Sequence, residues 1–486
     1  MKPHYRDIVK HSGVYGFGRI VSRLASIVLL PIHTRYLTPA DYGTIAILDL
    51  TAGVLAILVS GGMAGALSRY HFDAVDEDAE STVWWTGLTV ALGIATLVGV
   101  PAFVFRGAIA RFTLGPQEES GSFFYLLVLA TIWFGILSNI STAYLRVRKR
   151  SWLSVNLSLA SLFLNVALNI YFLAVCGWGI VGVLAGNLIT LAVMSVVRIG
   201  IFVRACGRFR FDGPLAGHLL RFGGPLVLTL LCATAMHQAD RYLLRLFVDL
   251  EQVGLYALAY AMGQGLNSLV LVPFSTIWSV VIYDIAKGPN AKDTYVRVFE
   301  YFLYALLLFF LGVSLFVRPL LSIVATPEYA GAAKLVPIVC LSFVFFSLDD
   351  HFKVPALLAK RTVSLIPANA MGAIANIVLN LLWIPRFGAA GAAWASVATY
   401  AVFAGVDLVR CRRIDRYDYP LSRCGLILGA MIVSFAGCEY VQRLNPGLMW
   451  SLTAPALVWS FWAVLLLYPV LRHYMRPPRE DFVTVS

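Results

Sequence analysis

Long apolar runs separated by short polar connections make up most of the chain. Each run is about 20 residues long, enough to cross a hydrocarbon core of roughly 30 Å as an α-helix. The runs lack the strict polar–apolar alternation of membrane strands, so a β-barrel is not expected. The pattern predicts an all-α polytopic membrane protein with about 14 transmembrane helices. The predicted helices fall near residues 14–36, 42–67, 83–105, 122–145, 152–175, 180–203, 219–247, 253–282, 297–317, 334–357, 363–384, 390–409, 423–441 and 451–471.

The composition agrees with a membrane location. Hydrophobic residues make up 59% of the 486 residues and charged residues only 13%, against roughly 25% charged in a soluble domain. The seven cysteines form no Cys-x-x-Cys pair, so we expect neither a disulfide framework nor a metal site. The first apolar run contains arginines and is not followed by a small-residue cleavage site, so we expect it to be retained.

One stretch of the chain occurs twice. KRSWLSVNLSLASLFLNVALN at 149–169 aligns without a gap on KRTVSLIPANAMGAIANIVLN at 360–380. The matches are mostly polar, which two unrelated apolar helices would not show. They include a Lys-Arg pair at the start and two asparagines near the end, Asn165 and Asn169 against Asn376 and Asn380. A long internal repeat of this kind indicates two structural copies.

The repeat predicts the domain organisation. We expect an N-lobe over 1–205, a C-lobe over 206–410 that includes a basic linker, and two further helices with a tail over 411–486. Each lobe would hold six helices. An even number returns the chain to its starting side, so the lobes would run parallel, related by a pseudo-two-fold axis along the membrane normal.

Lysine and arginine predict the orientation. With the N-terminus inside, the inner ends of the helices hold roughly three times as many basic residues as the outer ends. Both termini are then cytoplasmic. The net charge of +12 is explained by membrane lipids and anionic partners rather than by nucleic acid. The chain also lacks the phosphate-binding motif G-x-x-x-x-G-K-[ST], so ATP hydrolysis by that route is not expected.

The first predicted helix carries two arginines on one face. Arg19 and Arg23 are four residues apart, a spacing that brings side chains together on a helix. Each arginine at a helix centre costs about 2.5–3.5 kcal/mol unless water or an anion meets it. A guanidinium fork suits phosphate oxygens, so both are candidate substrate-binding residues. The alternative is that they extend to the cytoplasmic headgroups.

Five other positions are candidates for function. An acid inside an apolar run, such as Asp49, either relays a proton or pairs with an arginine of the first predicted helix. Arg69 ends the second predicted helix beside the acidic loop 73–81. On the seventh predicted helix, Asp240 and Arg241 follow His237 by three and four residues. These three residues could form an ion-coupling site, a substrate clamp or a structural ion pair.

Two further groups of polar residues favour structural interpretations. Charged residues at 349–353 end the tenth predicted helix, where we expect solvation at the membrane interface. The four repeated asparagines are expected to bridge neighbouring helices, since a buried amide in lipid stabilises helix packing by about 1 kcal/mol or less.

Two segments resemble a known family. LLPIHTRYLTPADYGTIAIL at 29–48, preceded by Gly16 and Arg19, is similar to the first two helices of Wzx-type flippases for O-antigen, capsule and exopolysaccharide. DRYLLRLFVDLEQVGLYALAYA at 240–261 echoes it in the second lobe. These flippases form the polysaccharide transport family of the multidrug/oligosaccharidyl-lipid/polysaccharide (MOP) superfamily. The resemblance extends over essentially the whole chain.

The resemblance implies a transporter rather than an enzyme, located in the bacterial inner membrane. Its cargo would be an undecaprenyl-diphosphate-linked oligosaccharide, moved from the cytoplasmic to the outer leaflet by alternating access around a cationic cavity. Family members line that cavity with basic residues, which here would be Arg23, Arg19, Arg69 and Arg241. Asp49, His237 and Asp240 are the candidates for H⁺ or Na⁺ coupling. A polysaccharide polymerase and export machinery are the implied protein partners.

Three alternatives remain open. A lipid II flippase and a drug/cation antiporter of the same superfamily would share the two-lobe architecture. The antiporter would need a mainly acidic cavity, whereas the charges within these helices are mainly basic. A membrane polymerase or glycosyltransferase would carry catalytic residues on a sizeable outer loop, and the largest outer connections here are short, near 106–121 and 318–333.

Overall fold

The computed structural model describes residues 29–60, 62–116, 118–444 and 448–474. Helices and the turns between them account for all of this part of the chain, in which no strand forms, and this confirms the predicted all-α class. Most of the first predicted helix, 14–36, lies outside the described residues. The chain divides into two compact units, Met1–Ala257 with Val324–Glu328 and Leu258–Ile323 with Tyr329–Ser486.

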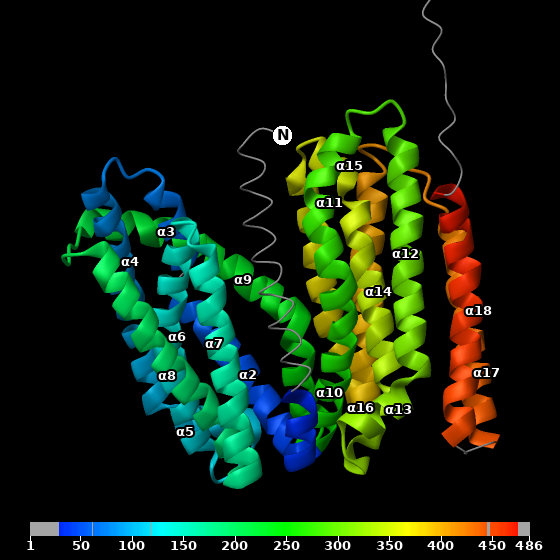
Figure 1. The fold of residues 1–486 in the computed structure, drawn as a ribbon, viewed down its shortest axis with the longest axis horizontal. Helices are drawn as coiled ribbons and strands as arrows, with labels where there is room; N and C mark the ends of the chain where they lie inside the picture. The colour runs from blue at the N-terminus through cyan, green and yellow to red at the C-terminus, as the bar shows by residue number, and fades with distance from the viewer. Residues whose placement is uncertain (1–28, 61, 117, 445–447, 475–486) are drawn as a thin grey trace, which may run out of the picture. The chain divides into compact units, whose positions relative to one another are not determined.

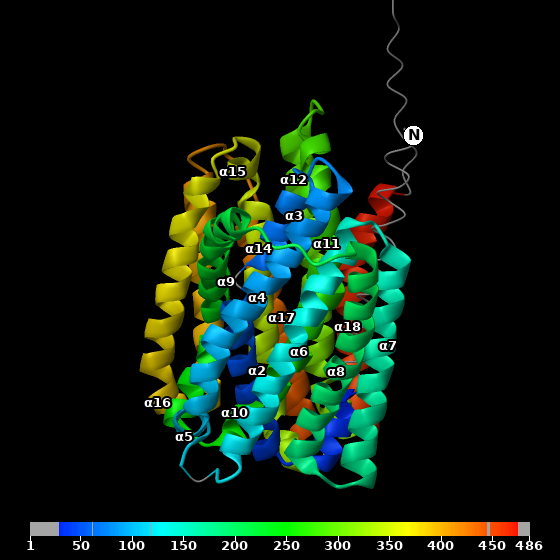
Figure 2. The same ribbon diagram turned by 90° about the vertical axis from the view of Figure 1, so that its left-hand side faces the viewer.

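The first unit contains eight labelled α-helices (Figures 1 and 2) and the start of a ninth. They are α2 (Pro39–Ser60), α3 (Met63–His71), α4 (Glu77–Val104), α5 (Arg106–Leu114), α6 (Gly121–Val147), α7 (Ser151–Ile170) with the π-helical turn η1 (Tyr171–Val175), α8 (Gly179–Cys206) and α9 (Gly213–Phe247), followed by α10 (Leu250–Leu266), which continues into the second unit. The lobe boundary at 205/206 remains a prediction, and α9 groups with the first unit here.

Three aromatic side chains lie within the mainly aliphatic core of the first unit, where α6 packs along α8 (Figure 2). Trp84 of α4 meets the ring of Tyr144 edge-on at 5.2 Å between centroids, and Tyr144 meets Phe202 of α8 at 5.5 Å. All three side chains are buried. Such edge-to-face pairs add about 0.5–1.5 kcal/mol beyond the area they bury, so this layer ties α4, α6 and α8 together.

The acidic loop 73–81 also begins a helix. Asp76 is the N-cap of α4, and its carboxylate accepts a hydrogen bond from the backbone N–H of Ala79 at 2.7 Å. Glu77, Asp78 and Glu80 lie in the first turn of α4, where negative charge is favoured by the helix dipole. The acids therefore stabilise the start of a membrane-spanning helix as well as meeting solvent.

The second unit is also built from helices. They are η2 (Asn267–Leu271), α11 (Val272–Ile285), α12 (Ala291–Leu315), α13 (Val317–Val324), η3 (Pro327–Lys334), α14 (Val336–Phe352), α15 (Val354–Leu358), η4 (Thr362–Leu365), α16 (Ile366–Cys411), α17 (Leu421–Leu444) and α18 (Leu448–Tyr474). α14 packs along both α12 and α16 (Figure 1), and α17 and α18 pack on α12.

The 46 residues of α16 form two helical segments, because Gly388 interrupts the helix with φ 57° and ψ −135°. A straight helix of this length would measure about 69 Å, more than twice the thickness of a bilayer core. The break falls between the predicted helices 363–384 and 390–409, at a residue whose positive φ glycine adopts without strain.

The two copies of the repeat share an unusual turn. Among the described residues other than glycine, only Lys149 and Lys360 have positive φ, 55° and 57°. Each follows the end of a helix, and the next N–H donates five residues back, from Arg150 to Leu145 and from Arg361 to Ala356. This is the hydrogen bond of a Schellman turn, in which a left-handed residue closes a helix. Corresponding positions thus adopt the same backbone geometry in each unit.

The repeated asparagines lie inside the helices, as expected of structural amides. Asn169 and Asn380 are 1% and 0% exposed, and each donates its amide N–H to the backbone carbonyl of the asparagine four residues earlier. Asn165 donates to Asn187 of α8 at 2.8 Å. An amide on α7 therefore bridges to its neighbouring helix within the first unit.

The surface of the helices shows that the protein is a multi-pass membrane protein. Large apolar side chains stay exposed along many of them, for example Leu228, Ile374, Val433 and Leu457, a pattern that soluble monomers avoid. Within the described residues, 11 helices are long and apolar enough to span a membrane, or up to 12 if the bent pair Pro327–Lys334 and Val336–Leu358 is one span. The total of about 14 remains a prediction.

Candidate functional site

Asp49 and Arg241 bring opposite charges together inside the first unit, where α2 packs against α9. Asp49 is exposed on α2, and Arg241 of α9 is half-buried. The guanidinium of Arg241 lies within electrostatic range of both Asp49 and the phenol of Tyr42. Two residues that the sequence singles out separately therefore belong to one polar site within a membrane-spanning region.

Asp240, the residue before Arg241 on α9, is enclosed. It is 2% exposed. One carboxylate oxygen accepts from the hydroxyl of Tyr256 on α10 at 2.5 Å, and the other from the backbone N–H of Arg241 at 2.9 Å. His237 lies within electrostatic range of it, one turn earlier on α9. Charge-assisted hydrogen bonds of this kind are about twice as strong as neutral ones, so Asp240 links α9 to α10.

A chain of hydroxyl groups, which the sequence analysis did not find, continues from this site. The hydroxyl of Thr51 accepts from Tyr242 of α9 at 2.7 Å and from Tyr125 of α6 at 3.1 Å, and it donates to the carbonyl of Ile47. Tyr125 also shares a hydrogen bond of 2.7 Å with Thr113 of α5. Four helices therefore meet through hydroxyls next to Asp49 and Arg241.

Arg245, one turn beyond Arg241, fixes the end of α9. Its guanidinium donates to the carbonyls of Leu114 at 2.6 Å and Val248 at 3.3 Å. These bonds fasten α9 to the end of α5. The sequence did not single out Arg245, because a partner that is a backbone carbonyl leaves no pattern in the sequence.

Arg69 lies apart from this group. It ends α3 with its side chain 58% exposed and forms an ion pair with Asp73 at 2.5 Å. The other two predicted basic residues, Arg19 and Arg23, lie outside the described residues. Of the seven predicted site residues, the structure thus brings together Asp49, His237, Asp240 and Arg241.

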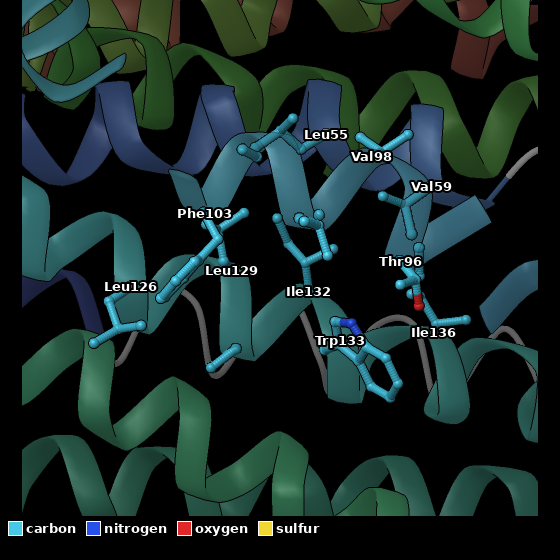
Figure 3. A pocket seen from close by; sticks show the side chains of 15 residues that line it. Leu55, Val59, Thr96, Val98, Phe103, Leu126, Leu129, Ile132, Trp133 and Ile136 are labelled. Atoms are coloured by element: carbon cyan, nitrogen blue, oxygen red, sulfur yellow. The ribbon is translucent and has the colours of Figure 1, made fainter. Parts of the chain in front are cut away.

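An apolar groove forms a second feature of the first unit (Figure 3). Its volume is about 360 Å³, and its walls come from α2, α4 and α6. Leu55, Phe103, Ile132 and Trp133 line it, with Thr96 as a hydroxyl-bearing neighbour. No charged residue contributes to the lining, so the groove can hold hydrocarbon but not a phosphate. Among the described residues there is also no group of three or more His, Cys, Asp or Glu side chains arranged so that it could hold a metal ion.

Comparison with known families identifies the chain. The sequence pattern of a family described as "Polysaccharide biosynthesis protein" matches residues 8–279, more than half of the chain. The chain belongs to this family. The matched region includes Arg23, Asp49, Arg69 and the polar residues of α9. No curated protein sequence matches this member of the polysaccharide biosynthesis family.

Solved structures identify the fold of this family member. "Lipid II flippase MurJ, inward closed conformation" superposes with a TM-score of 0.75 at 14% identity, covering 96% of this chain and 100% of that one. An inward-facing multidrug resistance MATE family transporter of the MOP superfamily gives 0.65 at 14% identity, with 82% and 98% covered. An outward-facing MATE transporter gives 0.58 at 16% identity, with 85% and 96% covered.

The chain therefore shares its fold with a lipid II flippase and with transporters of the MOP superfamily, as the sequence resemblance predicted. The named structures are flippases and transporters rather than enzymes, and the family description concerns polysaccharide biosynthesis. This polysaccharide biosynthesis protein therefore has a fold that solved flippases and transporters share.

Proposed function

We propose that the protein moves an undecaprenyl-diphosphate-linked oligosaccharide from the cytoplasmic to the outer leaflet of the bacterial inner membrane. The family match over residues 8–279 carries the proposal, because it connects the chain to polysaccharide biosynthesis. The fold it shares with a lipid II flippase supports a lipid-linked cargo. The excess of basic residues at one set of helix ends supports a cytoplasmic location for both termini.

The diphosphate is the part of this cargo that a cationic site recognises. Arg241 is half-buried in a membrane-spanning helix next to an exposed acid, and a guanidinium contacts phosphate oxygens in a bidentate manner. In this proposal Arg241 exchanges its interaction with Asp49 for the diphosphate, and Arg19 and Arg23 assist from the first helix. Arg69 receives the headgroup first, since its exposed ion pair with Asp73 is worth only about 0–1 kcal/mol.

Coupling would use the acids at the same place. When the diphosphate takes Arg241, Asp49 loses a cation and can accept H⁺ or Na⁺ in its place. Asp240 and His237 lie next to Arg241 on α9, so a change in their charge reaches the same site.

Transport by purified protein in liposomes tests the proposal. The measured quantity is the initial rate at which labelled undecaprenyl-diphosphate-linked oligosaccharide reaches the opposite leaflet. Removing one charge-assisted contact costs about 1.5–3 kcal/mol, so Arg241→Ala should slow transport roughly 10- to 100-fold. Arg241→Lys keeps the charge without the fork and should slow it less. Arg23→Ala should behave as Arg241→Ala does.

Arg416 provides a matched control. It is 75% exposed and pairs with Asp418 at 2.9 Å in the connection before α17, so Arg416→Ala should transport at the wild-type rate. Normal transport by folded Arg241→Ala and Arg23→Ala would overturn the assignment of these residues. Transport of lipid II alone would favour the lipid II flippase, and transport of cationic dyes alone would favour the antiporter.

A further inference from the structure

A buried charged cluster lies in the second unit, where α14 ends beside α16. Asp349, Asp350 and Lys353 come from the end of α14, and Asp407 comes from α16. From the sequence alone, residues 349–353 were expected to be solvated at the membrane interface. Instead Asp349 is 9% exposed and Asp407 only 1%. Carboxylates this deeply buried need partners, because burial of an unpaired charge is costly.

Lys353 accounts for part of the cluster. Its ammonium lies 2.8 Å from Oδ2 of Asp349 and 2.6 Å from Oδ1 of Asp350. The hydroxyl of Ser275, on α11, donates to Oδ2 of Asp350. Both oxygens of Asp350 are therefore satisfied, whereas Asp349 has a partner at Oδ2 only.

Two carboxylate oxygens of the cluster lack a hydrogen-bond donor, and the side chains that carry them lie next to each other. Oδ1 of Asp349 and Oδ1 of Asp407 are both buried with no hydrogen-bond donor. The Asp407 carboxyl lies within hydrogen-bonding distance of the Asp349 carboxyl. Ionised carboxylates only accept hydrogen bonds and repel each other at this range. A hydrogen bond between them requires a proton on one.

The net charge of the surrounding groups also favours one bound proton. Arg410 and Cys411 of α16 face Asp407, and His351 of α14 faces Asp350 and Lys353. His351 is fully buried between the rings of Phe274 and Phe302, where its neutral form is favoured. Asp349, Asp350 and Asp407 thus carry one more negative charge than Lys353 and Arg410 balance. One bound proton makes the cluster neutral.

A cavity reaches the cluster from one side. Its volume is about 370 Å³, and Asn267, Ser275, Asp349, Asp350 and Lys353 help to line it. Asp349 borders this cavity, whereas Asp407 is not among its lining residues. Its polar lining and volume suit water, which a proton needs for entry and exit.

We propose that Asp349 and Asp407 form a proton-binding site that exchanges with water in this cavity. The proton is taken from a hydronium ion at Asp349, forms an O–H bond to Oδ1 of Asp349 or Asp407, and leaves water behind. It returns to cavity water by the reverse step. A proton is the ligand that the two facing carboxylate oxygens fit, because it lets one of them donate a hydrogen bond to the other. The proposal does not depend on the identity of the transported lipid.

Infrared spectroscopy of the full-length protein in lipid nanodiscs tests the site. The signal is the C=O stretch of a protonated carboxylic acid, recorded at a pH where exposed aspartates are ionised. The wild type should show a band equivalent to one carboxylic acid from this pair. Asp407→Asn and Asp349→Asn should each abolish it, because either change leaves the remaining charges balanced. Lys353→Gln should have the opposite effect and raise the band to about twice its size, since a second proton replaces the lost cation.

Asp418→Asn is the matched control, because Asp418 is 78% exposed and pairs with Arg416. It should leave the band unchanged. The opposite responses of Asp407→Asn and Lys353→Gln separate proton binding from simple loss of structure. A wild-type protein without the band, or a band that survives both Asp→Asn changes, would show an ion-pair cluster with no bound proton. A failed transport assay would leave this measurement unaffected.

Discussion

The hydroxyl of Thr51 illustrates what a single residue contributes to the site. It accepts from Tyr242 and Tyr125 and donates to Ile47, so one small side chain joins α2 to α6 and α9. The sequence could not predict this role, because a threonine in an apolar helix most often bonds to the preceding turn, as Thr96 does to Leu92. By contrast, Asp49 and Arg241 could each be singled out as candidates, since a charge inside an apolar run is rare enough to indicate function. Their proximity could not be predicted, because the sequence favoured an arginine of the first helix as the neighbour of Asp49.

Replacing Thr51 by valine should therefore destabilise the first unit. Thr51→Val leaves the hydroxyl of Tyr242 without its acceptor at this position, and an unsatisfied buried polar group costs about 1–3 kcal/mol. We expect a lower Tm for the purified protein in detergent. Tyr242→Phe should lower the Tm less, because it removes the donor hydroxyl itself and leaves no unsatisfied donor at this position. Thr96→Val, at an exposed position, is the control. Equal Tm values for Thr51→Val and Thr96→Val would contradict the network.

At the scale of whole helices, α2 and α10 approach each other through glycine. A Cβ on Gly43 would lie 2.0 Å from the carbonyl oxygen of Leu250, and a Cβ on Gly254 would lie 1.8 Å from that of Pro39. Each glycine thus faces the first residue of the other helix. The sequence analysis paired these segments by their similar motifs, but their direct contact depends on tertiary packing.

Alanine at Gly43 should separate the two helices. Overpacking typically costs about 1–3 kcal/mol, and the overlap here involves backbone atoms, which cannot rotate away. Gly43→Ala should lower both the Tm and the yield of folded protein. Gly53→Ala, on the same helix with no atom within 4 Å of its new Cβ, should be neutral or stabilising by about 0.5–1 kcal/mol. A Gly43→Ala protein as stable as Gly53→Ala would rule out the close approach.

The helices themselves were the most predictable part of the structure. The predicted segment 122–145 corresponds to α6 at Gly121–Val147, because the length of an apolar run directly sets the length of a membrane helix. The π-helical turns η1 and η2 were not predicted, since a local change in hydrogen bonding leaves the hydrophobic pattern unchanged. The cluster at 349–353 was misread for a related reason, as its partner Asp407 is distant in sequence.

Across the whole molecule, the distribution of basic residues predicts the orientation in the membrane. The turns at Lys149 and Lys360 should both lie in the cytoplasm, because the copies of the repeat run parallel. Residue Glu119, in the connection before α6, should lie outside.

Labelling of single cysteines in intact cells measures this orientation. The background variant should lack Cys176 and Cys232, since the other five cysteines are buried. A membrane-impermeant maleimide should label Glu119→Cys in intact cells, and Lys149→Cys and Lys360→Cys only after the membrane is opened. Labelling of either lysine position from outside would reverse the predicted topology.

The left-handed turns at Lys149 and Lys360 also bear on the ancestry of the chain. The amino-acid sequences of the two copies diverge after a gene duplicates, and most positions in the two halves of this chain no longer carry the same residue. The handedness of a turn changes more slowly, because reversing it would redirect the helix that follows. A lysine there is tolerated at a cost of about 1–2 kcal/mol relative to the right-handed form, so its presence in both turns is better explained by inheritance than by chance. Lys149 and Lys360 are therefore equivalent positions, from which the sequences of the two halves can be aligned.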